Sequence, residues 1–326
     1  MTETELIRYR LKNISSKAYE HPADRAATAA LKSVPMLDTV VRRLIEFQYE
    51  RAFRQVLLAN SVKLGADQLP DVYRGYERAL EALDLPETYD LYLTQFPFAN
   101  AAAVGSGKPM VVLNSELLQL LDEDELRGVL GHEVGHILSD HVLYRTALLI
   151  LLQMTTTVSA LPILGGLPLL AVRTALLEWS RASELSADRA AVLVTRDPLV
   201  ICRVLMVLAA GLDSRRLNLD AFLRQATEYR EWESGWDKVS RFFVERRFDH
   251  AYPVRRVGEL MNWIRSGAYD RIIGGVYPTR DVDADPRAEA GDAVDYYTRR
   301  FKTIFREAGE GMEKAGGKLS DWLRRE

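Results

Sequence analysis

The feature that most constrains this chain is the segment Gly-His-Glu-Val-Gly-His at residues 131–136. We predict that it lies within a helix, because Asp122 and Glu125 upstream have the spacing of a capping box with Asp as the capping residue. Residues four apart share one face of a helix, so His132 and His136 can both reach one metal ion. The chain contains only five histidines, which makes a chance pairing rare.

Glu133 lies about 100° around the helix from His132, where it can flank a metal ion without binding it. A catalytic zinc site keeps one position open for water, and that water needs a base. Glu133 is therefore the candidate general base. We expect the helix to extend from Glu123 through at least Tyr144, which turns His141 away from the metal as a packing or exposed residue.

A third protein ligand must come from another segment, because no further histidine follows at a suitable spacing. A helix is expected from about Ala175 to the Asp-Pro pair at 197–198. It carries Glu184 and Asp188 four residues apart on one face. Such a pair alone is more often a solvated helix face. Beside the histidine segment, one carboxylate can bind the metal while the other orients a ligand imidazole.

Short strands are predicted upstream of the histidine segment. Residues 89–95 alternate in polarity, and residues 100–104 and 110–113 are apolar runs separated by Gly-Ser-Gly-Lys-Pro. Nearly all of the remaining chain has the pattern of helices. Three regions are expected: an N-terminal helical region (1–84) that packs on the catalytic domain, the catalytic domain that contains the histidine segment (85–270), and a linker with a charged helical tail (271–326).

The segment 131–136 and the later Arg-Ala-Ser-Glu-Leu-Ser-Ala-Asp at 181–188 resemble the HtpX and CAAX prenyl protease family of zinc endopeptidases. The resemblance implies an α+β, mainly helical, zincin-like domain of the gluzincin type. It would have a small antiparallel sheet and an active-site helix. One zinc ion per chain would have three protein ligands: His132, His136 and Glu184.

The resemblance also implies roles for neighbouring residues. Glu133 would be the general base, and Asp188 would hold a ligand imidazole by a hydrogen bond. An edge strand would pair with an extended polypeptide substrate, and the family's edge-strand positions match Asn100, Ala101 and Ala102.

His250 begins a segment, His-Ala-Tyr-Pro-Val-Arg-Arg, that resembles a downstream segment of the family. The proline follows His250 by three residues, whereas in the family it follows directly. Two interpretations stay open for His250: a catalytic residue that helps to hold the tetrahedral intermediate, or a residue that only packs.

The function implied is metalloendopeptidase activity, in which Glu133 accepts a proton from the attacking water and passes it to the leaving amine. A place in protein quality control would suit such an enzyme. One alternative is a zinc aminopeptidase, which the lack of an acidic amine-binding motif near Asn100 disfavours. The other is a non-catalytic scaffold, which the intact Glu133 disfavours because a structural zinc site needs no base.

Composition narrows the partners. A net charge of −3 argues against a nucleic-acid partner. The acidic N-terminus has no apolar core typical of a secretory signal, and the lone Cys202 fits a reducing compartment. We therefore expect a cytoplasmic protein that is not secreted, and the sequence leaves its oligomeric state open.

The run 146–172 carries no charge but is interrupted by Pro162, by Gly165 and Gly166, and by Pro168. A helical hairpin buried against the zinc domain is the favoured interpretation. Peripheral or shallow membrane association, through this run or through the C-terminal tail, is the alternative.

Overall fold

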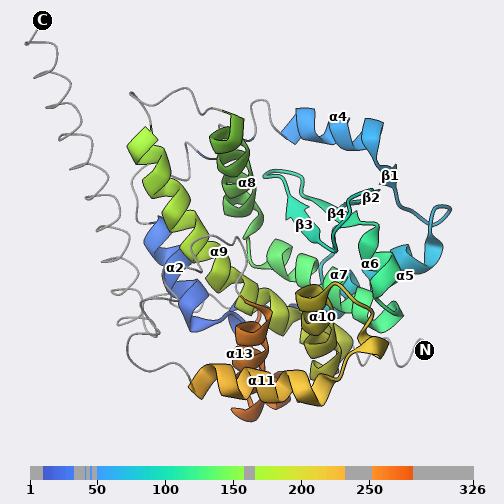
Figure 1. Ribbon diagram of the computed structural model, residues 1–326, viewed down its shortest axis with the longest axis vertical. Coiled ribbons are helices and arrows are strands. Elements are labelled where there is room, and N and C mark those ends of the chain that lie inside the picture. Colours follow the sequence, from blue (N-terminus) through green and yellow to red (C-terminus); the bar gives the residue numbers. More distant parts are fainter. Residues whose placement is uncertain are drawn as a thin grey trace, which may run out of the picture.

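The computed structural model describes residues 10–32, 41, 45, 50–157, 166–231 and 252–281. Within them the chain is mainly helical with one small sheet, so the predicted fold class is confirmed. The α-helices are α2 (Pro22–Lys32), α4 (Glu50–Asn60), α5 (Pro70–Ala82), α6 (Glu116–Leu120), α7 (Glu123–Leu138), α8 (Val142–Thr157), α9 (Gly166–Thr195), α10 (Pro198–Ala210), α11 (Leu219–Glu231), α13 (Pro253–Arg265) and α14 (Ala268–Ile273). Helix α7 lies between the sheet on one side and α9 and α10 on the other (Figure 1).

The sheet has four strands in the order β1-β2-β4-β3. Their bounds are β1 (Val62–Lys63), β2 (Asp90–Thr94), β3 (Ala101–Val104) and β4 (Met110–Asn114). The three strands predicted from sequence are confirmed as β2, β3 and β4. The sheet is mixed, however, whereas an antiparallel sheet was expected. Strand β4 lies between β3 and β2. It runs antiparallel to its hairpin partner β3 and parallel to the earlier strand β2.

The start of α7 follows the prediction, with the Asp122 side chain and Glu125 forming a capping box. The predicted continuous helix to Tyr144 is wrong, because α7 ends at Leu138 and α8 begins at Val142. Asp140 between them has φ 56°, in the left-handed region that stops a helix. This break redirects every residue after it, including His141.

Two glycines of the histidine segment allow α7 to lie very close to α9. A Cβ atom on Gly135 would be 2.5 Å from the Ala190 Cβ, and one on Gly131 would be 2.8 Å from the Val194 Cβ. Real Cβ atoms do not approach this closely, so only glycine fits at both positions. The close approach places the carboxylates of α9 opposite the histidines of α7.

The uncharged run 146–172 covers most of α8 and the start of α9, and residues 158–165 lie outside the described residues. The described ends of the two helices pack through side chains that include Leu143, Tyr144, Leu176 and Trp179. Within the part of the chain that is described, no helix combines the length and apolar character needed to cross a membrane. The buried hairpin therefore stays a prediction.

The N-terminal region lies against the predicted catalytic domain where it is described. Helix α2 packs on α9, and α5 packs on α7. Only residues up to 281 of the predicted linker and tail are described. The three-region division remains a prediction.

Candidate active site

Three side chains from α7 and α9 converge on one point. The Nε2 atoms of His132 and His136 are 3.1 Å apart. The Glu184 Oε2 lies 3.4 Å from the His132 Nε2, and the Glu184 Oε1 lies 3.4 Å from the His136 Nε2. For zinc bonds of 2.0–2.1 Å, the ligand atoms of a tetrahedral site are about 3.3 Å apart. The three residues thus have the spacing of a zinc site, and they could hold a metal ion together.

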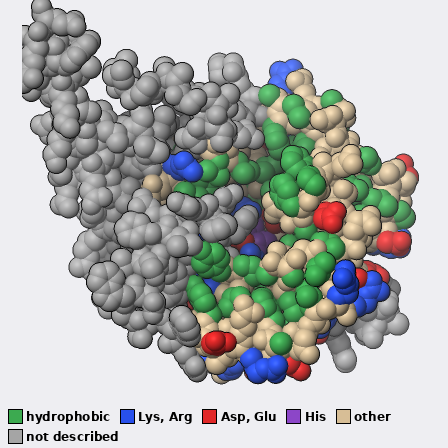
Figure 2. Space-filling model, viewed as in Figure 1, with side chains coloured by type: hydrophobic (Ala, Val, Ile, Leu, Met, Phe, Trp, Pro, Cys, Tyr) green, Lys and Arg blue, Asp and Glu red, His purple; other side chains and the backbone are tan. Residues whose placement is uncertain are grey.

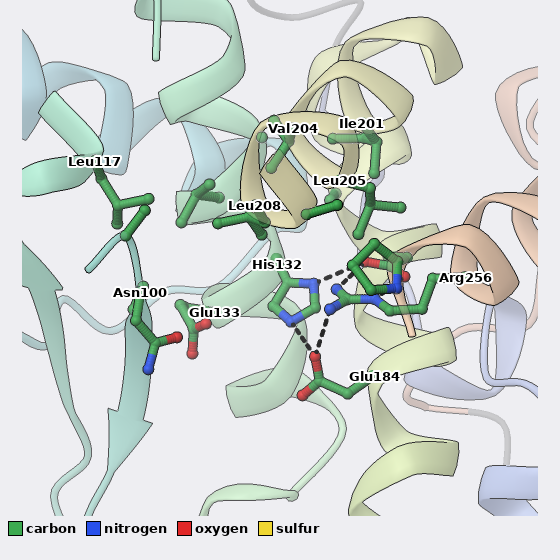
Figure 3. A pocket seen from close by; sticks show the side chains of 18 of the residues that line it. Asn100, Leu117, His132, Glu133, Glu184, Ile201, Val204, Leu205, Leu208 and Arg256 are labelled. Atoms are coloured by element: carbon green, nitrogen blue, oxygen red, sulfur yellow. Dashed lines mark hydrogen bonds and ion pairs between the residues drawn. The ribbon is translucent and has the colours of Figure 1, made fainter. Parts of the chain in front are cut away.

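His132 is held by a buried carboxylate. Its Nδ1 lies 3.1 Å from Oδ1 of Asp188. The Arg256 side chain of α13 donates to both oxygens of Asp188, at 2.8 and 2.6 Å, and its Nη1 is 3.1 Å from Oε2 of Glu184. Figure 3 shows His132, Glu184 and Arg256 directed toward one another. Arg256 therefore contacts both carboxylates.

The charges around His132 favour a cation at its Nε2 atom. Burial lowers the pKa of His132, but hydrogen bonds to Asp188 and Glu184 outweigh burial and raise the pKa to about 9. Burial raises the pKa of the Asp188 carboxyl, and the Arg256 guanidinium outweighs it, so the net shift is downward. Asp188 therefore stays ionised and accepts the Nδ1 proton of His132, which directs Nε2 toward the metal position.

His136 has different neighbours. The Arg145 Nη1 lies 2.6 Å from the His136 Nε2 and also donates to Glu184 Oε1. The His136 Nδ1 lies 3.0 Å from the Nδ1 of His141. Burial, followed by the charge of Arg145, holds the pKa of His136 well below its usual range. Because Arg145 can only donate, a neutral His136 presents a lone pair on Nε2, as a zinc ligand must.

The candidate base is tied to the sheet. The Glu133 Oε2 accepts a hydrogen bond of 2.6 Å from the backbone N–H of Ala103, in strand β3. The other oxygen, Oε1, has no hydrogen bond to a residue within the described ranges. Glu133 is thus fixed through one oxygen, and the second is left to exchange a proton.

Strand β3 forms one end of the sheet. The Asn114 N–H donates to the Asn100 carbonyl, so the register alternates from there, and the main-chain groups of Ala101 and Ala103 face outward. The Ala103 N–H is taken by Glu133. Of the three predicted edge positions, Ala101 is therefore the one whose N–H and C=O can both pair with a substrate, while the backbone of Ala102 faces β4.

A cavity of about 500 Å³ opens beside these residues. Its polar part contains His132, Glu133 and Glu184, and Asn100 lies next to Glu133 (Figure 3). Apolar side chains of α10 cover the opposite wall: Ile201, Val204, Leu205 and Leu208. Figure 2 shows the hollow from outside, with a histidine at its bottom and hydrophobic side chains along much of its described rim.

The structure brings together the predicted residues of α7, α9 and β3, while His250 lies outside the described residues. It adds Arg145, Arg256 and His141, which the sequence argument did not place in the site. Arg256 had a signal, because it lies in the segment that resembles the family. His141 had none, because the predicted continuous helix turned it away from the metal, and no sequence pattern pointed to Arg145.

Comparisons with known proteins agree with this geometry. The family model Peptidase family M48 matches residues 67–264. The chain is 35% identical over 269 residues to plastoglobule-localized metallopeptidase 48, chloroplastic, of Arabidopsis thaliana, covering 80% of this chain and 76% of that protein.

More distant relatives include two proteins named protease HtpX homolog. The one from Streptococcus mutans is 30% identical, over 31% of this chain and 34% of its own length. The one from Paenarthrobacter aurescens is 29% identical, over 42% of this chain and 54% of its own length. No solved structure matches the chain. The extent of the family match and the identity to the plant protein show that this chain belongs to peptidase family M48 and is a metallopeptidase.

Proposed function

We propose that this metallopeptidase is a zinc endopeptidase that cleaves extended polypeptide segments, with one zinc ion per chain held by His132, His136 and Glu184. The observation that carries the proposal is the convergence of these three ligand atoms beside Glu133. Zinc held there would supply Lewis acidity, polarising the scissile carbonyl and making water nucleophilic near neutral pH.

Glu133 is the residue we propose to move the proton. The Ala103 N–H holds one carboxylate oxygen, so the other can accept a proton from water and deliver it to the leaving amine. The same hydrogen bond joins the base to strand β3. A substrate strand that pairs with Ala101 is therefore placed in register with the base by the sheet itself.

Asp188 and Arg256 are proposed to orient the site without touching substrate. Asp188 fixes the ring of His132, and Arg256 lies against both Asp188 and Glu184. Their burial keeps water away from these contacts. His250 is proposed, from the family resemblance alone, to help to hold the tetrahedral intermediate.

Endopeptidase action fits the cavity better than aminopeptidase action. The acidic side chains among its described lining residues are Glu133, Glu184 and Asp188. Glu133 is the proposed base, and the other two already contact arginine or histidine. A free α-amino group would need a further carboxylate. The described lining offers none.

The apolar wall of α10 supports a proposal about substrate. Side chains that fit it are those that folded proteins bury, so an unfolded polypeptide would supply them more readily than a folded one. A place in protein quality control follows as a proposal. The expected cytoplasmic location and the alternative of peripheral or shallow membrane association stay predictions, and the oligomeric state stays open.

The test compares wild type with Glu133→Gln for zinc content and for cleavage of unfolded casein. We expect Glu133→Gln to bind zinc normally and to lose cleavage by about 10²- to 10⁴-fold. Glu123→Gln, on the exposed surface of the same helix, serves as the control. Full activity in Glu133→Gln would overturn the role of the base.

A second measurement separates the two peptidase types. A peptide with an acetylated N-terminus should be cleaved at the same internal bonds as the free peptide. Cleavage restricted to unblocked N-terminal residues would favour the aminopeptidase alternative.

A further inference from the structure

His141 links the candidate ligand His136 to the N-terminal helix α2. Its Nδ1 is 3.0 Å from the His136 Nδ1, and its Nε2 is 3.0 Å from Oδ2 of Asp24. The three side chains are almost completely inaccessible to solvent. The His141 ring also packs edge-on against Trp179, with centroids 5.5 Å apart. His141 is therefore held between two fixed partners.

The direction of these hydrogen bonds can be worked out from Asp24. Ser186 accepts the His21 backbone N–H, so its hydroxyl proton is directed to Asp24 at 2.5 Å. Thr28 accepts the indole N–H of Trp179, so its hydroxyl proton is also directed to Asp24.

An ionised Asp24 can only accept hydrogen bonds. The Nε2 of His141 must therefore donate to it. A neutral His141 then carries its lone pair on Nδ1, which leaves His136 to supply the proton between the two rings.

Arg145, at the His136 end of this chain of contacts, requires the same proton positions. Arg145 cannot accept a hydrogen bond, so the His136 Nε2 that it contacts must carry a lone pair. A neutral His136 then has its proton on Nδ1 and donates it to His141. The arginine and the aspartate thus require one and the same proton arrangement, although they lie at opposite ends of the chain of contacts.

We propose that Asp24 and His141 are positioning residues that fix the tautomer and the ring orientation of His136, so that its Nε2 is presented to zinc. The proposal rests on the metal role proposed for His136. Asp24 belongs to α2, outside the segment 67–264 that matches the family model. The N-terminal helix is accordingly a part of the metal site, and not only a covering element.

The first experiment measures the zinc dissociation constant by competition with a chelating indicator. Two single variants are used, Asp24→Ala and His141→Phe, the second of which preserves a ring for packing against Trp179. Losing such an outer partner weakens metal binding by about 10- to 100-fold. We expect this range for each variant.

A double variant tests whether Asp24 acts through His141. If it does, adding Asp24→Ala to His141→Phe should not weaken zinc binding further. A double variant whose loss of zinc affinity equals the product of the two single losses would overturn the proposal, because independent effects multiply. Single variants that bind zinc within about twofold of wild type would overturn it as well.

Tyr19→Phe is the matched control. The buried Tyr19 hydroxyl contacts Ser139 and the Gly135 carbonyl, so the variant loses an N-terminal hydrogen bond near α7 without touching His141. Its zinc affinity should equal that of wild type. Equal losses in this control and in Asp24→Ala would reduce the effect to general packing and overturn the proposal.

The second experiment needs no variant and so does not depend on folding of a mutant. Nitrogen-15 NMR of the zinc-loaded protein reports which ring nitrogen of each histidine carries a proton. We expect the proton on Nδ1 of His136 and on Nε2 of His141. A proton on Nδ1 of His141 would contradict the positioning role proposed for Asp24 and His141. If wild type binds no zinc, the proposed function fails. If wild type binds zinc and only the tests of Asp24 and His141 fail, the proposed function stands and the positioning role does not.

Discussion

The two histidines proposed as metal ligands share that proposed role but have different supports. His132 rests on the Asp188 support, formed by Asp188 and Arg256, which come from α9 and α13 within the segment that matches the family model. His136 rests on the Asp24 support, formed by His141 and Asp24, of which Asp24 lies before that segment.

The difference lies in where charge is placed. In the Asp188 support, an ionised carboxylate touches the ligand imidazole directly, and a buried guanidinium balances it. In the Asp24 support, the carboxylate is separated from the ligand by a ring. The Asp188 support also reaches a second ligand, Glu184, through Arg256. Removing the Asp188 support should therefore lower the free energy of unfolding and the zinc affinity more than removing the Asp24 support.

Asp188→Ala is the variant with the largest expected effect. It removes the acceptor of His132 and leaves Arg256 buried without its main partner. We expect the free energy of unfolding to fall by about 3–5 kcal/mol and zinc affinity to fall by at least about 10- to 100-fold. Urea denaturation and chelator competition measure the two losses. The expected difference between the two supports is contradicted if Asp188→Ala reduces both stability and zinc affinity less than Asp24→Ala does.

Gly135→Ala should act on both supports together. The new methyl group would meet the Ala190 Cβ at 2.5 Å and push α7 away from α9, separating the histidines from Glu184. We expect a loss of about 1–3 kcal/mol in unfolding free energy, together with weaker zinc binding.

Gly128→Ala is the matched control for Gly135→Ala. Its methyl group would meet the Ile201 Cδ1 at 2.7 Å, the far end of a flexible side chain that can move aside. A smaller loss of stability is expected there, measured by the same denaturation. Equal losses at the two glycines would show that helix separation at the metal site is not the cause.

Thr28→Val should have the smallest effect on zinc. Thr28 accepts the Trp179 indole N–H and donates to Asp24, so the variant leaves a buried donor unpaired. We expect a stability loss of about 1–3 kcal/mol, with zinc affinity close to wild type because His141 still reaches Asp24. A zinc loss as large as that of Asp24→Ala would show that the whole hydrogen-bond cluster, and not the contact with His141, supports His136.

Local patterns predicted much of the fold. The capping box at Asp122 marked the start of α7, and the Asp-Pro pair at 197–198 marked the end of α9. The Asn218 side chain accepts the Ala221 N–H at the start of α11, a capping contact of the same local kind. These features depend on neighbours within a few residues, which a sequence displays directly.

The missed features depend on a single backbone angle and on distant contacts. Nothing in the helical pattern of 123–144 showed that Asp140 adopts a left-handed conformation. That one residue ends α7 and brings His141 and Arg145 back to His136. Asp24 is 117 residues from His141, the difference of their numbers, and no local pattern relates the two.

The most direct test of the central claim is anomalous diffraction at the zinc edge from crystals of the zinc-loaded protein. We predict one peak per chain, about 2.0–2.2 Å from the Nε2 atoms of His132 and His136 and from a carboxylate oxygen of Glu184. Zinc bound at other residues, or a fully loaded protein with no peak at these three, would contradict the account.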